Sequence, residues 1–155
     1  MFSMKKILCP TDFSEGSLAA VSQAGELVHQ AGGVMYLVNV IPVQPGLPTD
    51  PNYVFKVPEY ERTLHSEAEH QLQEIAQPLN ARGVETRTFI GHGDAASEIV
   101  RIADQEDVDL IIISTYGNTG WRRFAFGSVT EKVVRLAQCP VLTVRNRPNV
   151  AGRAA

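Results

Sequence analysis

The sequence has little of what marks secreted, membrane-bound or zinc-binding proteins. Its only two cysteines, Cys9 and Cys139, are too few for a disulfide framework in 155 residues, so we expect two reduced, buried thiols. Neither stands at a metal-ligand spacing from any histidine, which argues against zinc. No apolar run approaches the ~20 residues of a membrane-spanning helix. The apolar strand after the N-terminal lysines is too short for a signal-peptide core.

Charge of one sign is also missing. The 14 basic and 17 acidic residues give a formal net charge of −3, so we expect no general attraction to nucleic acid or to an acidic membrane surface. The 44% hydrophobic and 20% charged content is typical of a globular protein. A chain of this length predicts a single domain with its own core. We therefore expect a cytoplasmic protein.

Short apolar runs alternate with amphipathic segments along the whole chain. The apolar runs predict β-strands at Lys5–Pro10, Val34–Val40, Val84–Ile90, Asp109–Ile113 and Val141–Arg145. The segments between them predict helices from the Ser14 N-cap to Gly32-Gly33, over Glu59–Arg82, over Ala95–Gln105 and over Val129–Leu136. Strands joined by helices through short connections imply right-handed parallel units, and hence a doubly wound α/β domain.

Three local patterns refine this prediction. Helical spacing predicts that the first helix buries a stripe of Leu18, Val21, Gly25 and Val28, and that the second buries Leu64, Ala68, Leu72, Ile75 and Leu79. Five prolines in Ile41–Pro58 predict a long surface excursion there. Gly91-His92-Gly93 predicts a turn before the Asp94 helix cap. The G-x-G-x-x-A pattern that begins at Gly91 lacks the acidic residue at the end of the next strand that dinucleotide binding requires.

The most informative stretch follows the strand at Asp109–Ile113. Small and turn-forming residues end this strand, and after a loop the chain reaches Gly127-Ser128 at the start of the last helix. A strand, a glycine-bearing loop and a helix start can together hold a phosphate, because unpaired backbone N–H groups point out of the helix and glycine permits close approach. The pattern predicts phosphate contacts from the backbone amides of Gly117, Asn118, Gly127 and Ser128.

This stretch resembles the ATP-binding signature of the universal stress protein family, which is Gly, two residues, Gly, nine residues, Gly, then Ser or Thr. Gly117, the nine residues 118–126, Gly127 and Ser128 match it, while Ser114 stands in place of the first glycine. Lys6–Ser17 is similar to the first strand and turn of the family, and Cys139–Arg145 to its last strand. The three segments occur in the family's order, which makes the resemblance specific.

The resemblance implies an α/β, Rossmann-like domain of the adenine nucleotide alpha hydrolase-like type. Its five-stranded parallel sheet would have the strand order 3-2-1-4-5, with four helices. Ligands of such sheets bind outside the carboxyl ends of the strands, where the winding reverses between strands 1 and 4. We expect the domain to cover residues 1–146 and a flexible tail to cover 147–155.

The resemblance also implies a ligand and a partner. The ligand is ATP, with Mg or Mn shared by its phosphates; Asp12 matches the adenosine-side contact of the family, and Val40 the position whose backbone meets the adenine edge. The implied cofactor-binding residues are Pro10, Thr11, Asp12, Val40, Ser114, Gly117, Asn118, Gly120, Gly127, Ser128, Val129 and Thr130. No catalytic or metal-ligating residue is predicted. A homodimer is implied, in which the strand Val141–Arg145 pairs with its counterpart.

Several residues allow a second interpretation. Ser128-Val129-Thr130-Glu131 is also a capping box, in which Ser128 Oγ accepts a hydrogen bond from the Glu131 amide. Asp12 is equally consistent with a turn aspartate that caps the first helix. Serine at position 114 would cost about 1 kcal/mol if its φ had to be positive.

Three functions are therefore open at the level of sequence. The first is an ATP-binding regulatory protein of the stress response with an unknown protein partner. The second is a dimeric stress protein that binds no nucleotide and acts by protein contacts, for which Ser114 is the indication. The third is a slow ATPase; no general base is evident in the loop, so we expect at most weak hydrolysis.

Overall fold

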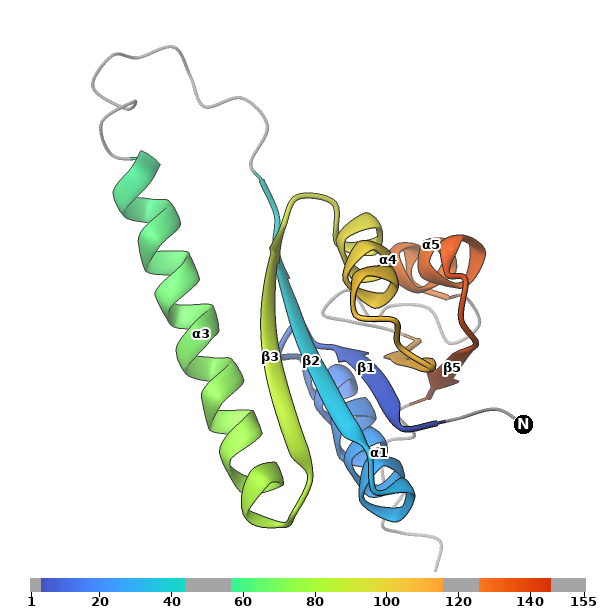
Figure 1. The fold of residues 1–155 in the computed structure, drawn as a ribbon. Helices are drawn as coiled ribbons and strands as arrows, with labels where there is room; N and C mark the ends of the chain where they lie inside the picture. The colour runs from blue at the N-terminus through green and yellow to red at the C-terminus, as the bar shows by residue number, and fades with distance from the viewer. Residues whose placement is uncertain (1–3, 44–56, 116–125, 146–155) are drawn as a thin grey trace, which may run out of the picture.

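The computed structural model describes residues 4–43, 57–115 and 126–145. They form a five-stranded parallel sheet in the order β3-β2-β1-β4-β5 (Figure 1). The elements are β1 (Lys6–Pro10), α1 (Glu15–Ala31), β2 (Val34–Ile41), α3 (Val57–Ala81), β3 (Glu85–His92), α4 (Ala95–Gln105), β4 (Leu110–Ser114), α5 (Ser128–Leu136) and β5 (Val141–Val144). The predicted fold class and strand order are confirmed. None of the described helices combines the length and the apolar character needed to cross a membrane.

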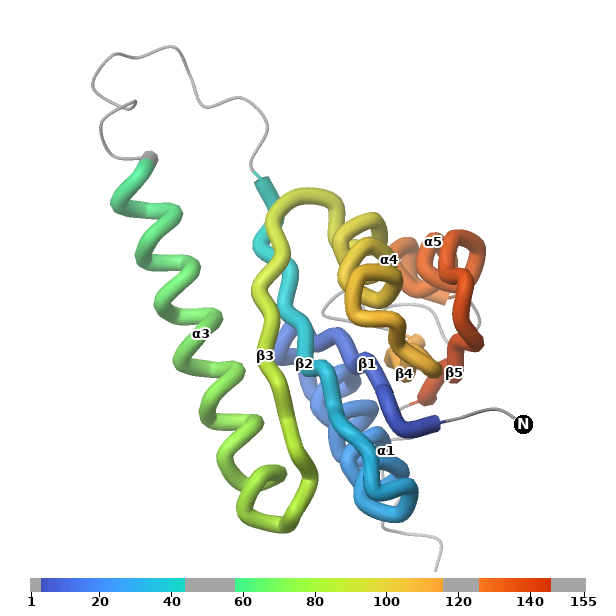
Figure 2. Tube along the Cα trace, in the orientation of Figure 1, coloured from blue at the N-terminus to red at the C-terminus, as the bar shows by residue number. Residues whose placement is uncertain are grey.

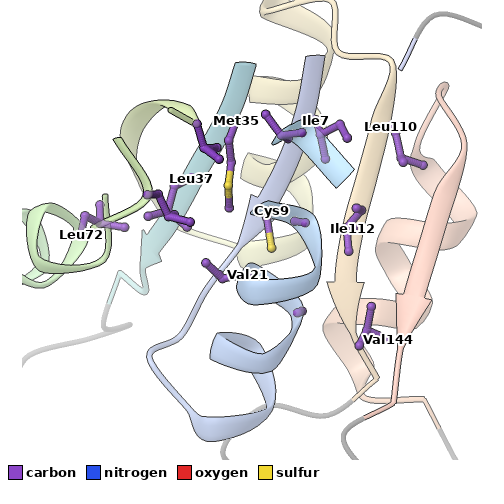
Figure 3. Close-up of a cluster of buried hydrophobic side chains, with 14 residues drawn as sticks. Ile7, Cys9, Val21, Met35, Leu37, Leu72, Leu110, Ile112 and Val144 are labelled. Carbon is purple, nitrogen blue, oxygen red and sulfur yellow. The ribbon is translucent and has the colours of Figure 1, made fainter. Parts of the chain in front are cut away.

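Helices cover both faces of the sheet, with α1 and α3 on one face and α4 and α5 on the other (Figures 1 and 2). The first face holds alternate residues of each strand, among them Ile7 and Cys9 of β1 and Ile112 of β4 (Figure 3). Leu8 and Ile111, which point the opposite way, belong to the second cluster. Burial on both faces explains why these strands are continuously apolar in sequence.

Helix α1 starts and stops where the sequence predicts. Ser14 is its N-cap, and Gly32, with φ of 62°, is its C-cap. Leu18 was predicted on the buried stripe but is 39% exposed, so that prediction is wrong. At about 100° per residue, Leu18 lies roughly a quarter turn from the centre of the inward face. That face is formed by Ser17, Ala20, Val21, Ala24, Gly25 and Val28.

Two predicted boundaries need correction. Pro58 belongs to the first turn of α3 and not to a surface excursion; proline fits there because its missing N–H removes no helical hydrogen bond. Gly91 and His92 were predicted in a turn, but they are the last residues of β3 and pair with β2. The turn falls at Gly93, whose φ is 115° and whose N–H donates to the Ile41 carbonyl at 2.9 Å. Residues 44–56, the middle of the predicted excursion, lie outside the described residues.

Burial along α3 is uneven. Ala68, Leu72, Ala76 and Leu79 are buried, whereas Leu64 and Ile75, also predicted on that face, are only half-buried. No residue of the range 58–67 is buried. In this first part of the helix, His65 stacks on His92 of β3, with ring centroids 5.6 Å apart. The core contact of α3 therefore comes from its second part.

Both cysteines are free thiols. Cys9 is fully buried in the core of β1, as predicted, and burial raises the pKa of its thiol far above the ordinary value. Cys139 was also expected to be buried, but it is only half-buried. It lies just before β5, and desolvation raises its pKa as well.

Candidate functional site

A pocket of about 320 Å³ opens at the carboxyl edge of the sheet, where the winding reverses between β1 and β4. Its volume lies within the range of ~300–1,000 Å³ that small-molecule sites occupy. Apolar side chains from β2, β4 and α4 face polar groups from the β1–α1 turn and the start of α5. The described residues that line it are Pro10, Thr11, Asp12, Val38, Asn39, Val40, Ala95, Ile99, Ile113, Ser114, Gly127, Ser128, Val129 and Thr130.

The β1–α1 turn brings a carboxylate to the wall of this pocket. Asp12 Oδ1 accepts a hydrogen bond from the Ser14 N–H at 3.0 Å and another from the Ser14 hydroxyl. Asp12 therefore stabilises the turn, as its second interpretation predicts, although Ser14 and not Asp12 is the helix N-cap. The same contacts hold the carboxylate against the pocket, so the turn role and a ligand role are compatible.

Two hydrogen bonds join the start of α5 to the end of β4. Thr130 Oγ1 donates to the buried Ser114 carbonyl at 2.8 Å, and the Gly127 N–H donates to the Thr115 carbonyl at 2.8 Å. The Gly127 amide is thus engaged within the fold, which corrects the expectation that it binds phosphate. Gly127 lines the pocket without offering that donor.

The predicted capping box is also wrong. Gly127 is the N-cap of α5, no side chain among the described residues caps the helix, and the Glu131 N–H donates to the Gly127 carbonyl at 3.0 Å. Ser128 is the first helical residue, so its hydroxyl does not bind the Glu131 amide. The first N–H groups of a helix have no intrahelical acceptor. The N–H groups that α5 directs outward are therefore those of Ser128, Val129 and Thr130.

Ser114 fits its position without backbone strain. It ends β4, is 7% exposed, and pairs with Val144 of β5. Among the described non-glycine residues, positive φ occurs at Phe13 and Asp107, and Ser114 is not one of them. The anticipated cost of serine at this position therefore does not arise.

Helix α4 supplies the apolar wall opposite the turn. Its N-cap Asp94 accepts from the Ser97 N–H at 2.9 Å and from Lys132 Nζ of α5 at 2.8 Å. The Lys132 ammonium, followed by the Ser97 hydroxyl and amide, holds the pKa of Asp94 well below its usual range. This exposed ion pair joins the starts of α4 and α5, while Ala95 and Ile99 of α4 line the pocket.

Most of the predicted binding residues meet around this one pocket. They are Pro10, Thr11, Asp12, Val40, Ser114, Gly127, Ser128, Val129 and Thr130. Gly117, Asn118 and Gly120 lie outside the described residues, and their role stays a prediction. Sequence reasoning missed Val38, Asn39, Ala95, Ile99 and Ile113. Of these, Asn39 left a signal, because it is a lone polar residue in the apolar run of β2.

The electrostatics follow from the parallel sheet. Every helix that follows a strand begins at the carboxyl edge, so α1, α4 and α5 all direct the positive ends of their dipoles there (Figure 1). Apolar walls suit a flat uncharged group, and the outward amides of α5 suit an anion. Fold and site together define a doubly wound α/β protein with a pocket of small-molecule size at its topological switch point.

Known proteins narrow this class to one family. The model of the universal stress protein family matches residues 4–145, and the chain belongs to that family. Universal stress protein MJ0531 of Methanocaldococcus jannaschii is 34% identical over 143 residues, which cover 91% of this chain and 82% of that protein. The solved structure of MJ0577, from the same organism, is 31% identical and covers 94% of this chain and 99% of its own, with a TM-score of 0.78.

A second similar solved structure contains a nucleotide. The universal stress protein from Archaeoglobus fulgidus in complex with dAMP has a TM-score of 0.62 over 92% of this chain and 98% of its own. At 22% identity, this likeness establishes a common fold.

Proposed function

We propose that this protein binds ATP in the pocket at the β1/β4 switch point and acts as a nucleotide-dependent regulatory protein of the stress response. The observation that carries the proposal is that one pocket has apolar side chains on one side and the outward amides of the α5 start on the other. The dAMP complex of the Archaeoglobus fulgidus protein supports an adenine nucleotide as the ligand class.

The adenosine half of the ligand fits the apolar side of the pocket. Val40 and Ile99 offer surfaces on which an adenine ring packs, and Asp12 offers a carboxylate acceptor for a ribose hydroxyl or the adenine amine. Thr11 and Pro10 complete the wall beside Asp12. In the proposed pose, Asp12, which carries the only charge of the described lining, lies beside hydrogen-bond donors of the nucleoside.

The phosphates fit the α5 side. Ser128, Val129 and Thr130 present amides at the positive end of the helix dipole, and the Ser128 hydroxyl makes no hydrogen bond with another described residue. Gly117, Asn118 and Gly120, from the loop before this helix, would add amides to the same phosphates. Among the described residues no cluster of three acidic, histidine or cysteine side chains could hold a metal, so Mg or Mn would be bound chiefly by phosphate oxygens.

The proposed role is binding and not a dedicated reaction. The described lining contains one carboxylate, Asp12, and no histidine, and in the proposed pose Asp12 contacts the nucleoside and not the phosphates. A general base for water is therefore missing from this part of the pocket. We propose that occupancy by ATP regulates binding of a protein partner.

We also propose a homodimer through β5, as the family resemblance implies. Val141–Val144 is the last strand at one end of the sheet, and Leu142 on it is 44% exposed. An exposed apolar edge strand is stabilised by pairing with a second copy. Sedimentation equilibrium of Leu142→Arg should give a monomer, whereas Leu27→Arg, at an exposed site on α1, should leave the dimer intact.

The first test is the nucleotide content of the purified protein, released by denaturation and separated by ion exchange. We expect about one adenine nucleotide per chain, or stoichiometric ATP binding by calorimetry in the presence of magnesium. A protein that is empty and that stays empty with millimolar ATP would refute the proposal. It would instead favour the dimeric protein that acts by protein contacts alone.

The second test isolates the Asp12 carboxylate with a matched control. Asp12→Asn keeps the Oδ1 acceptor of the turn but removes the charge. Because losing a hydrogen bond to a charged group costs ~1.5–3 kcal/mol, we expect the dissociation constant of ATP to rise about 10- to 100-fold. Asp94→Asn changes another aspartate near the same sheet edge that does not line the pocket. We expect it to leave ATP affinity within about threefold. Equal effects of both variants would contradict a specific role for Asp12.

A further inference from the structure

The turn that carries Asp12 contains a residue in an unfavourable backbone conformation. Phe13 has φ of 64°, a left-handed value that is a true outlier for a bulky aromatic residue. Its ring packs partly buried against the core cluster beneath α1. Such a conformation persists only when its surroundings fix it, and it is often found beside a ligand site.

A chain of buried hydroxyl groups fixes the turn from within. The Phe13 N–H donates to Thr11 Oγ1 at 3.0 Å, Thr11 Oγ1 lies 2.9 Å from Ser17 Oγ, and Ser17 Oγ donates to the Ser14 carbonyl at 3.0 Å. Because each hydroxyl has one proton, the Thr11 hydroxyl must donate to Ser17. The chain therefore runs in one direction from Phe13 to Ser14, and every hydroxyl in it is satisfied.

Thr11 also joins this series of hydrogen bonds to the sheet. The Thr11 N–H donates to the Val38 carbonyl of β2 at 2.8 Å, and Asn39 Nδ2 of β2 donates to the Thr11 carbonyl at 2.8 Å. Thr11 is 5% exposed and Asn39 8% exposed, so both groups are shielded from water that could replace the bond. The main chain of Thr11 is thus held at both its polar groups by β2.

We propose that Asn39 is a positioning residue for the nucleoside half of the site. Through the Thr11 carbonyl it fixes the strained turn at Phe13, and the turn in turn fixes the Asp12 carboxylate at the pocket wall. Asn39 needs no contact with the ligand for this role. The inference rests on the proposed function, since the group that Asp12 receives is the nucleoside of an adenine nucleotide.

The test separates the two halves of the ligand. Asn39→Leu keeps the approximate volume but removes the donor, while Asn39→His restores an N–H at the position of Nδ2, because Nδ1 is also bonded to Cγ. Calorimetry would measure binding of adenosine, of ATP and of inorganic tripolyphosphate. We expect Asn39→Leu to weaken adenosine and ATP about tenfold and to leave tripolyphosphate, which contacts α5, unchanged within about twofold. Asn39→His should recover most of the loss.

A second pair of variants serves if Asn39→Leu does not fold. Thr11→Val removes the acceptor of the Phe13 amide, and Thr11→Ser retains it, so the same contrast between adenosine and tripolyphosphate is expected. Hydrogen exchange adds a readout without ligand: the Phe13 amide should exchange faster in Thr11→Val, while the Val133 amide of α5 should not change.

Each outcome decides one claim. If the wild type binds ATP and folded Asn39→Leu binds it equally well, the inference fails and the proposed function stands. If Asn39→Leu weakens tripolyphosphate as much as adenosine, Asn39 has only a general structural role, and the inference fails as well. If the wild type binds no adenine nucleotide, both the proposed function and the inference about Asn39 are wrong.

Discussion

Gly33→Ala offers a strict test of how β1 and β2 are joined. Gly33 lies between α1 and β2, and a Cβ atom built on it would lie 2.1 Å from the Lys5 carbonyl oxygen and 2.8 Å from the Lys5 Cα. These are backbone atoms, so no side-chain rotation can relieve the overlap. Moving the Lys5 backbone away would also disturb two hydrogen bonds, because the Asp109 carboxylate accepts from the amides of Lys5 at 2.9 Å and Lys6 at 2.8 Å.

The expected loss of stability follows from two terms. Forcing an extra methyl group into a packed site costs ~1–3 kcal/mol. Displacing Lys5 also breaks the 2.6 Å hydrogen bond from the Val34 N–H to the Lys5 carbonyl, which is worth ~0.5–1.5 kcal/mol. Together they lower the free energy of unfolding by about 1.5–4.5 kcal/mol. For a domain of this size, each kcal/mol lowers Tm by roughly 2–4 °C, so Tm should fall by about 3–18 °C.

The adjacent glycine is the matched control, because it is required for a different reason. Gly32 has φ of 62°, and a Cβ there would meet nothing within 4 Å. Gly32→Ala should therefore cost only the left-handed conformation, ~1–2 kcal/mol, and Gly32→Asn less, since asparagine tolerates that conformation.

Urea unfolding of the four variants, Ala and Asn at each position, tests the reasoning. We expect asparagine to improve on alanine at Gly32 and to be no better at Gly33. If Gly33→Ala destabilised the protein no more than Gly32→Ala, the close approach of the two strand starts would not be the reason for glycine at position 33.

Three further predictions concern the site and its surroundings. Thr130→Val should lower the free energy of unfolding, measured in urea, by about 1–3 kcal/mol and weaken ATP binding, because the Ser114 carbonyl loses its buried donor. Thr130→Ser keeps the donor and should lose little stability or affinity. Equal losses in both variants would contradict this role of Thr130. Asp94 has a lowered pKa in the folded protein, so its contribution to stability is complete above its ordinary value of ~3.9 and is lost as pH falls through the lowered pKa. In an NMR titration Lys132→Met should raise that pKa, and an unchanged titration would rule out the ion pair. With the half-buried Cys139 replaced by serine, the Cys9 thiol, buried and with a raised pKa, should react with a thiol reagent at about pH 8 only after unfolding. Rapid labelling of the native Cys139→Ser protein would show that β1 opens.

Sequence predicted the parts of the fold that depend on local patterns. The apolar runs around Leu8 and Ile111 predicted strands buried on both faces, and Ser14 and Asp94 predicted helix starts, because a cap is a contact between near neighbours in the chain. It failed where neighbouring elements decide. Gly91 belongs to a strand because β2 offers it a hydrogen-bonding partner, which outweighs the turn preference of glycine.

The site divides in the same way. Asp12 was predicted through a family motif, whereas Ile99 enters the pocket only because α4 packs beside β2, and no motif records that contact. Ser128 matches a capping box letter by letter. The helix nevertheless starts one residue earlier, because the Gly127 amide binds the Thr115 carbonyl and sets where the first turn begins.

The uneven burial of α3 predicts that the two parts of this helix exchange their amide protons at different rates. Beyond Ala68 its amides are locked by the core, and they should exchange with solvent only when the whole domain unfolds. Before Ala68 the helix can fray turn by turn without exposing any core side chain, and the stacking of His65 on His92 gives this part a contact with the sheet. We therefore expect the first turns of this helix to open and close on their own timescale while the sheet and its pocket stay folded.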